Sequence, residues 1–197
     1  MARPAEFDRT DVLEKAMGVF WRTGYSATSV TDLVNATSLK PGSLYGAFKS
    51  KRDLFIEVID TYAARSLSRV STIVGEADSP IEGIETFFDC FCKDLAADNI
   101  GKGCLMVNTM LELATEDDHI RERISGYLDG LESHFREALI KAQEKGEVDK
   151  NLIPEDMATY LMTNIWGLRV LSTKRPEPQK YEAIVKNIMN ALHAPKH

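Results

Sequence analysis

The sequence predicts an all-α protein of about nine helices, and three observations support this expectation. Apolar residues recur at intervals of three and four over long stretches, which is the spacing of one face of a helix. Ser, Asp and Pro stand where these stretches begin, and Gly stands where several of them end, as helix boundaries favour. No stretch alternates apolar and polar residues over a length that would form a strand.

Residues 29–55 contain three closely spaced helix-start signals. Ser29 and Ser50 each stand three residues before an Asp, so that hydroxyl and carboxylate can satisfy the free amide groups of a helix N-terminus reciprocally. Between them, Pro41 fits only the first turn of a helix and disfavours helical backbone at Lys40, which becomes the N-cap. The short connections predict a helix-turn-helix followed by a supporting helix, an arrangement that binds DNA.

The helix that starts at Pro41 is short, and its apolar residues mark the face that points inward. Leu44 and Phe48 lie four residues apart and share that face. The helix over residues 8–23 is expected to end at Gly24, which supplies the left-handed backbone of a helix C-terminus. The first three helices would then form a small core that mounts the third.

The same region carries basic residues and lacks acidic ones. Between residues 33 and 52 there is no Asp or Glu, and Lys40, Lys49, Lys51 and Arg52 are basic. Phosphates repel acidic side chains, and Lys and Arg release the counterions of a duplex when they bind it. A solvated basic face would explain the charge alone, but the tight helix-turn-helix spacing favours nucleic acid.

The composition is that of a globular protein with a sizeable core: 197 residues, 44% hydrophobic and 27% charged. Residues 1–60 hold eight basic and eight acidic residues, so the remainder carries the whole formal net charge of −6. Phosphate binding depends on the local field, so an acidic remainder is compatible with it. The chain has no signal-peptide core and no run of eighteen apolar residues, and we expect it in the cytoplasm.

The N-terminal third contains a set of motif residues that extends beyond the helix-turn-helix: residues 12–16, Phe20, Gly24, Tyr25, Thr28, Ser29, Val30, Leu33, Val34, Gly42, Ser43, Leu44, Tyr45, Phe48, Ser50, Lys51, Leu54 and Phe55. This set resembles the TetR-type (TetR/AcrR) family of transcriptional regulators. Beyond about residue 59 the expectation rests on helical architecture and not on motifs.

The resemblance implies a repressor that binds a palindromic operator in double-stranded DNA and is released by a small-molecule, reactive-electrophile or oxidant inducer. Residues 1–50 would form the DNA-binding domain, continued by a linking helix over residues 51–72, and residues 73–197 would bind the effector and dimerise. From charge alone we add Lys40 and Lys49 to the DNA contacts. The contacts implied by the resemblance are Gly42, Ser43 and Tyr45 with groove and phosphates, Lys51 with a phosphate, and Thr28 with the DNA backbone.

Two final helices, over residues 154–174 and 178–192, carry more apolar surface than one face of a monomer needs. Ordinary core packing accounts for part of this surface. TetR-like proteins pair two such helices with their symmetry mates in a four-helix bundle, which implies a homodimer. The predicted interface consists of Tyr160, Asn164, Gly167, Leu171, Tyr181, Ile184, Ile188 and Met189.

Cys104 follows Gly101, Lys102 and Gly103 at an expected helix start, where the helix dipole and a neighbouring ammonium favour a thiolate. A Gly-Cys pair at this place is similar to TetR-type regulators that respond to electrophiles or oxidants. A buried, inert thiol is the alternative. A non-covalent effector pocket is the broader expectation, and ordinary core packing is its alternative. Its candidate residues are Asn108 as a polar anchor and Phe88, Phe91, Tyr127 and Trp166 as lining.

No constellation of residues indicates catalysis or metal binding. The four His are scattered, and Cys90 and Cys92 are two apart on a helix, which points them away from each other. We therefore expect no enzyme activity, no metal, no cofactor and no membrane partner. The alternative from another class is a helical cysteine-dependent enzyme or ligand carrier in which the helix-turn-helix is incidental. It predicts turnover or covalent adducts, without salt-sensitive DNA binding.

Overall fold

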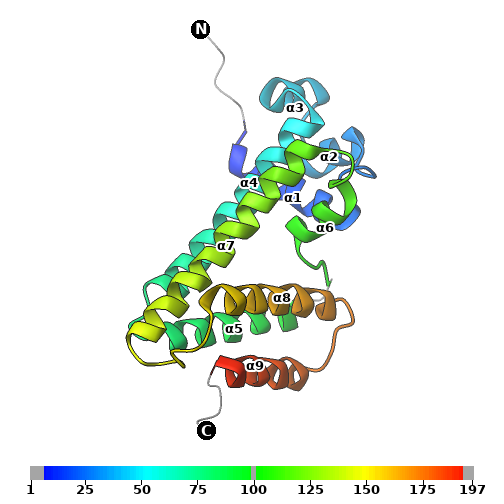
Figure 1. Cartoon of the computed structure of the whole chain (residues 1–197). Coiled ribbons are helices and arrows are strands. Elements are labelled where there is room, and N and C mark those ends of the chain that lie inside the picture. The colour runs from blue at the N-terminus through cyan, green and yellow to red at the C-terminus, as the bar shows by residue number, and fades with distance from the viewer. Residues whose placement is uncertain (1–6, 99–100, 193–197) are drawn as a thin grey trace. The chain divides into compact units, whose positions relative to one another are not determined.

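The structure, a computed structural model, describes residues 7–98 and 101–192, and within them it contains helices and connecting segments without a strand. This confirms the predicted all-α fold. A π-helical turn, Ser71–Gly75, follows the fourth helix. The nine α-helices of the described residues are α1 (Arg9–Thr23), α2 (Val30–Thr37), α3 (Pro41–Phe48), α4 (Lys51–Val70), α5 (Pro80–Ala97), α6 (Leu105–Leu113), α7 (Asp118–Glu144), α8 (Pro154–Ser172) and α9 (Pro178–Leu192) (Figure 1).

The chain divides into two compact units, and a later segment joins the N-terminal one. The first unit comprises the described residues up to Ala64 together with Leu105–Ile124, and so contains α1, α2, α3, α6 and parts of α4 and α7. The second comprises the described residues of Arg65–Cys104 and Ser125–His197, and so contains α5, α8, α9 and the rest of α4 and α7. The helix-turn-helix is therefore completed by a helix more than fifty residues further along the chain.

The first unit encloses an aromatic core. Phe20 of α1 lies against Phe55 of α4 with ring centroids 4.8 Å apart, and the ring of Tyr25 lies at the same distance from that of Phe55. Leu44 and Phe48 of α3 are 3% and 2% exposed, which confirms that they share the inward face. Burial of these two side chains anchors the short helix α3 on the core.

All three helix-start signals of the N-terminal region are realised. The Ser29 hydroxyl accepts from the Asp32 amide at 3.1 Å, and the Asp32 carboxylate accepts from the Ser29 amide at 2.9 Å. The Ser50 hydroxyl likewise accepts from the Asp53 amide at 3.0 Å. Pro41 is the first residue of α3, where its fixed φ suits the helix. Each such serine cap contributes about 1 kcal/mol, so local chemistry sets these boundaries.

The turn between α1 and α2 is held by a carboxylate from α6. The amides of Tyr25 and Ser26 donate to the Glu112 carboxylate at 3.0 and 2.7 Å. Gly24 has a φ of +78°, and a Cβ on it would lie 2.7 Å from a Glu112 oxygen. Glycine is therefore required there both for its backbone conformation and for the close approach of Glu112.

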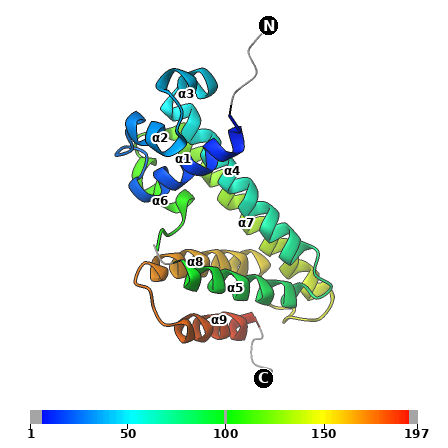
Figure 2. The ribbon, with the colours of Figure 1, turned by 180° about the vertical axis from the view of Figure 1, so that it is seen from behind.

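The second unit packs α5 against α8 and α9, which lie side by side in two opposite views (Figure 1, Figure 2). Its centre is aromatic. Phe88 of α5 and Phe135 of α7 are both fully buried, and the ring of Phe87 meets that of Phe135 edge-on with centroids 5.2 Å apart. Phe91 is 4% exposed and stacks on Phe87, so the aromatic residues of α5 form a continuous core.

Helix α9 turns most of its apolar residues into the second unit, which corrects part of the predicted dimer interface. Tyr181, Ile188 and Met189 are 2%, 1% and 6% exposed, so they belong to the core of the single chain and have no surface to offer a partner. A helical apolar stripe looks the same in sequence whether it faces a protomer core or a second protomer. The other five predicted residues are exposed or half-buried: Tyr160, Asn164, Gly167, Leu171 and Ile184.

Glu112 should make the stability of the first unit depend on pH in the acid range. Burial raises the pKa of this carboxyl, but the amide hydrogen bonds from Ser26 and Tyr25 and the charge of Lys51 outweigh it, so its pKa is lowered. A lowered folded-state pKa stabilises the fold above the unfolded value, about 4.3, and this contribution is lost as pH falls through the folded value.

We therefore expect Glu112→Gln to lower the melting temperature at neutral pH and to flatten its decline from about pH 5 to about pH 3, as thermal scans by circular dichroism would measure. Glu116→Gln, at an exposed carboxylate nearby in the chain, is the matched control. Identical pH profiles for wild type and Glu112→Gln would contradict the role assigned to this carboxylate.

Candidate nucleic-acid interface

Helix α3 turns a polar face outward, opposite its buried anchors. Gly42, Ser43 and Tyr45 are all exposed, Tyr45 by 44%. A Cβ added at Gly42 or Gly46 would meet nothing within 4 Å, so this face is open and low. A helix with such a face fits the major groove of B-form DNA, which is about 12 Å wide.

The N-terminus of α3 favours an anion. Lys40, the N-cap, is exposed, and its side chain makes no capping hydrogen bond. The first turn of α3 contains no acidic residue. Because a helix N-terminus carries partial positive charge, a phosphate placed there would be stabilised by the helix dipole and by the Lys40 ammonium together.

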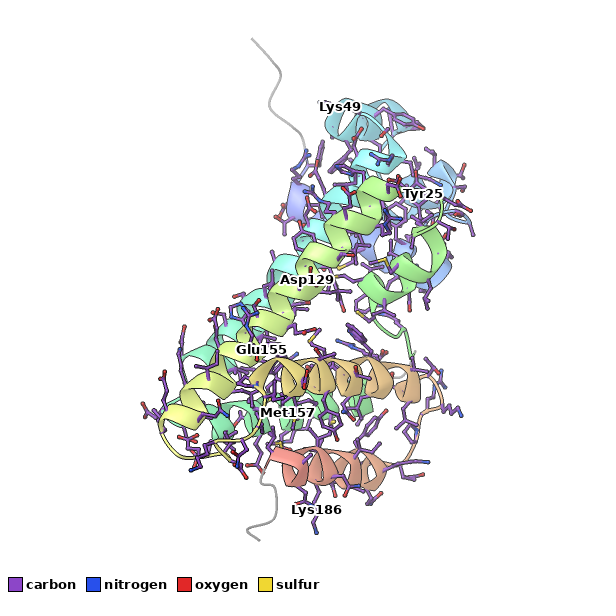
Figure 3. The ribbon with its side chains drawn as sticks, in the orientation of Figure 1. Tyr25, Lys49, Asp129, Glu155, Met157 and Lys186 are labelled. Atoms are coloured by element: carbon purple, nitrogen blue, oxygen red, sulfur yellow. The ribbon has the colours of Figure 1, made fainter. Side chains whose placement is uncertain are left out.

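The C-terminus of α3 ends in a strained turn at Lys49, which Figure 3 places at the end of this helix. Lys49 has φ +62° and ψ −51°, and the Ser50 amide donates to the Phe48 carbonyl at 2.6 Å. This is a γ-turn, a conformation that costs a residue with a side chain about 1–3 kcal/mol. The turn leaves Lys49 exposed at the edge of the α3 face.

Lys51 braces the α1–α2 turn from the start of α4. Its ammonium donates to the carbonyls of Tyr25 and Thr28 at 2.9 and 2.8 Å, and it lies 4.3 Å from the centre of the Tyr25 ring. These bonds occupy the ammonium inside the unit. Two of its three N–H groups are used in this way, which favours a structural role for Lys51, and its contact with a phosphate stays a prediction.

Thr28 is also part of the turn. It is 1% exposed, and its hydroxyl donates to the Gly24 carbonyl at 2.5 Å and lies 2.6 Å from the Thr23 hydroxyl. A buried hydroxyl cannot reach a phosphate. The prediction that Thr28 contacts the DNA backbone is therefore corrected, because the side chain supports the helix-turn-helix from within.

The four basic residues between residues 33 and 52 fall into two pairs, one bonded within the unit and one exposed to solvent. Arg52 donates to both Asp117 oxygens at 3.0 Å, and the Ile120 amide and this arginine together lower the pKa of Asp117. With Lys51 also engaged, two of the four cations between residues 33 and 52 stabilise the unit. Lys40 and Lys49 remain exposed at the two ends of α3.

The residues predicted to bind an effector are distributed over both units. Their role in effector binding stays a prediction. Cys104 is 8% exposed and directly precedes α6, Phe88 and Phe91 lie in the core of the second unit, Tyr127 and Trp166 are half-buried in that unit, and Asn108 is exposed on α6 in the first unit.

Three side chains that shape the interface were not predicted from the sequence: Glu112, Arg9 and its partner Glu57. Arg9 and Glu57 stand 48 residues apart in the chain, and Glu112 stands 86 residues from Ser26. No local pattern marks such pairs, because each residue alone resembles an ordinary solvated charge on a helix. Their partners become visible only when the fold brings the helices together.

Neither a metal centre nor a membrane span is found in the part of the chain that the structure describes. Among residues 7–98 and 101–192, no group of three or more His, Cys, Asp or Glu side chains is placed to hold a metal ion. None of the helices in these ranges has the length and apolarity needed to cross a bilayer.

Known proteins resemble the chain over both units. The family model of bacterial regulatory proteins of the tetR family matches residues 12–58, and the tetracyclin repressor-like C-terminal domain matches residues 80–188. The HTH-type transcriptional repressor ComR of Escherichia coli (strain K12) is 30% identical over 169 residues, which cover 85% of this chain and 80% of ComR. The HTH-type transcriptional repressor DhaR of Mycobacterium sp. (strain GP1) is 27% identical over 86% of this chain and 85% of DhaR.

A solved structure has the same arrangement of helices. It is a double cysteine mutant of the TetR family transcriptional regulator CifR in complex with 26-base-pair double-strand operator DNA, with a TM-score of 0.86 and 30% identity over 96% of this chain and 99% of that one. The C-terminal family model alone spans more than half of the chain. This chain therefore belongs to the tetR family of bacterial regulatory proteins.

Proposed function

We propose that this protein is a transcriptional repressor that binds a palindromic operator as a homodimer and leaves it when an inducer binds. The observation that carries the proposal is the exposed face of α3, with Gly42, Ser43 and Tyr45 between Lys40 and Lys49. This face has no acidic residue and is mounted on a buried core. The repressors ComR and DhaR and the operator complex of CifR support it.

Three parts of the chain would divide the work; their bounds are those expected from the sequence and differ from the compact units, in which Leu105–Ile124 belongs to the first unit. In this proposal residues 1–50 bind the operator, residues 51–72 link, and residues 73–197 dimerise and take the inducer. An inducer that binds a conformation whose recognition helices no longer match the operator lowers DNA affinity by linkage. Family membership favours such a regulator over a cysteine-dependent enzyme or ligand carrier.

The partner protomer would bind along α8. Tyr160, Thr163, Gly167 and Val170 follow one another at intervals of three and four residues and are all exposed. Val170 is 62% exposed and Tyr160 39%, which is unusual for large apolar side chains of a helix that also packs in a core. Gly167 at the centre of this stripe lets two helix backbones approach closely, as a symmetric pairing of α8 with its copy requires.

The direct test of the function is selection of duplexes by the purified protein from a random DNA library. A palindrome with half-sites one helical turn apart, about 34–36 Å, is the expected product. DNase footprinting on that duplex should then protect both halves. Failure to enrich any sequence at low salt would contradict the proposal.

Substitution of Lys49 and Lys51 should separate phosphate contact from fold support. Lys49→Ala should reduce the slope of log affinity against log salt by about one per protomer, because one phosphate contact is lost. Lys51→Ala should leave the slope unchanged and lower the melting temperature, because the carbonyls of Tyr25 and Thr28 lose their donor. A slope reduced equally in both variants would show that Lys51 leaves the turn and binds DNA.

Substitution on α8 should separate dimerisation from folding. Val170→Asp places a charge in the proposed interface and should give folded monomers that lose operator affinity, measured by sedimentation equilibrium and DNA titration. Ile188→Asp is the contrasting control, because this residue is 1% exposed and its substitution should unfold the second unit. If the Val170→Asp protein remains dimeric at micromolar concentration, the dimer interface does not include this part of α8.

Thiol modification tests whether Cys104 senses electrophiles. Cys104 directly precedes the N-terminus of α6, near Lys102, whereas burial and Asp89 raise the pKa of Cys92 to about 11, so that thiol stays neutral and unreactive at pH 7. N-ethylmaleimide should release operator DNA from the wild type and from Cys92→Ser, but not from Cys104→Ser. A response that persists in Cys104→Ser would contradict the sensor role of Cys104 and point to Cys90, the half-buried third thiol.

A further inference from the structure

Arg9, the first residue of α1, joins three helices of the first unit through one guanidinium. Its Nη2 donates to the two carboxylate oxygens of Glu57 on α4 at 2.6 and 2.8 Å, and its Nε donates to one of them at 3.2 Å. Its Nη1 donates to the carbonyl of Ala47 on α3 at 3.3 Å. The guanidinium carbon also lies 4.2 Å from the centre of the Phe48 ring.

We propose that Arg9 is a positioning residue for DNA recognition, which fixes the C-terminal end of α3 against α1 and α4. The proposal rests on the function proposed above, with α3 as the recognition helix. Arg9 contacts the last two residues of α3, Ala47 and Phe48, by a hydrogen bond and by a cation–π contact. Because the Glu57 carboxylate on α4 orients the guanidinium, Arg9 meets the end of α3 in one defined orientation.

The end of α3 needs such support because the backbone is strained there. Lys49, the next residue, holds the γ-turn with φ +62°. Strain of this kind persists only where the surroundings over-determine the conformation. Arg9 contacts the two residues before Lys49, and Ser50, the residue after it, is anchored on α4 because its hydroxyl accepts from the Asp53 amide. The turn is thus held on both sides, and with it the exposed Lys49.

The geometry requires an arginine and a carboxylate together. The planar fork of a guanidinium matches both oxygens of Glu57 and leaves another N–H for the Ala47 carbonyl, which a lysine ammonium cannot reproduce. The Glu57 charge also compensates that of Arg9. Arg9 therefore acts on DNA binding through the placement of α3 and not through its own attraction for phosphates.

The direction in which Glu57→Gln changes DNA affinity distinguishes a positioning role of Glu57 from a simple effect of its charge. Removal of a carboxylate from a DNA-binding unit strengthens binding to any duplex if only electrostatics matter. If Glu57 holds Arg9 in place, Glu57→Gln weakens operator binding although the unit becomes more positive. Weaker binding to the operator, together with unchanged or tighter binding to random DNA, has no explanation in net charge.

The experiment measures affinity for the selected palindrome and for a scrambled duplex of the same length, over a series of salt concentrations. Arg9→Lys and Glu57→Gln should each lose about threefold in operator affinity, as expected for an ion pair whose side chains are 48% and 37% exposed, and keep their affinity for the scrambled duplex. Their salt slopes should equal that of the wild type. The double variant should be no weaker than either single one, because both remove the same interaction.

Lys15→Gln is the matched control, since Lys15 pairs at 2.7 Å with Asp11, four residues earlier in the same helix. It should change both affinities by the same factor. Wild-type operator affinity in Arg9→Lys, tighter binding in Glu57→Gln, or equal losses on both duplexes would each overturn the proposal. A salt slope reduced by about one per protomer in Arg9→Lys would also overturn it, since Arg9 would then be a phosphate contact.

Hydrogen exchange in the DNA-free protein tests the placement independently of any operator. The Lys49 amide donates to the Tyr45 carbonyl at 2.8 Å, so its exchange reports on the end of α3. Exchange should be faster in Arg9→Lys and Glu57→Gln and unchanged in Lys15→Gln. Unchanged exchange in the first two overturns the positioning role even if the wild type selects a palindrome. If exchange is faster in these variants but the wild type selects no palindrome, the positioning of α3 by Arg9 is supported and only the proposed repressor function is contradicted.

Discussion

The arrangement of the DNA-binding unit depends on the burial of Leu44 and Phe48. Helix α3 has eight residues, fewer than the roughly 12–15 at which an isolated helix becomes even marginally stable. Its stability and its orientation therefore come from these two side chains in the core. Two anchors on one face leave the ends of a short helix free to tilt, and the features around α3 act at those ends. Pro41 rigidifies the first turn, and Arg9 holds the last one.

The turn between α1 and α2 is fixed by side chains from two other helices of the unit. Tyr25 donates its amide to Glu112 and accepts at its carbonyl from Lys51, so one residue is held by an anion from α6 and a cation from α4. The opposite charges of the two holders stabilise each other across the turn, since Lys51 helps to lower the pKa of Glu112. The placement of α2 after α1 consequently depends on α4 and α6 as well, through Lys51 and Glu112.

The basic residues of the helix-turn-helix region divide between support of the fold and the proposed contact with DNA. The acid-free run from residue 33 to residue 52 predicts a basic surface, but Lys51 and Arg52 donate hydrogen bonds within the unit. Lys40 and Lys49 remain at the two ends of α3. When a surface presents only a few cations, its binding to phosphates depends more on their positions than on their number. The strained turn at Lys49 therefore bears on the recognition that we propose, because it sets the position of this exposed cation.

The sequence by itself determined the helices, their boundaries and the inward face of α3, because caps, Pro and Gly signals and helical periodicity act within about four residues. Only the tertiary structure decided the roles of Lys51 and Thr28, the clamp of Arg9 on Glu57, and the inward direction of the apolar stripe of α9. Periodicity gives the spacing of a stripe but not the surface that covers it, and an ion pair 48 residues apart leaves no local trace. Such contacts exist only after the helices have packed.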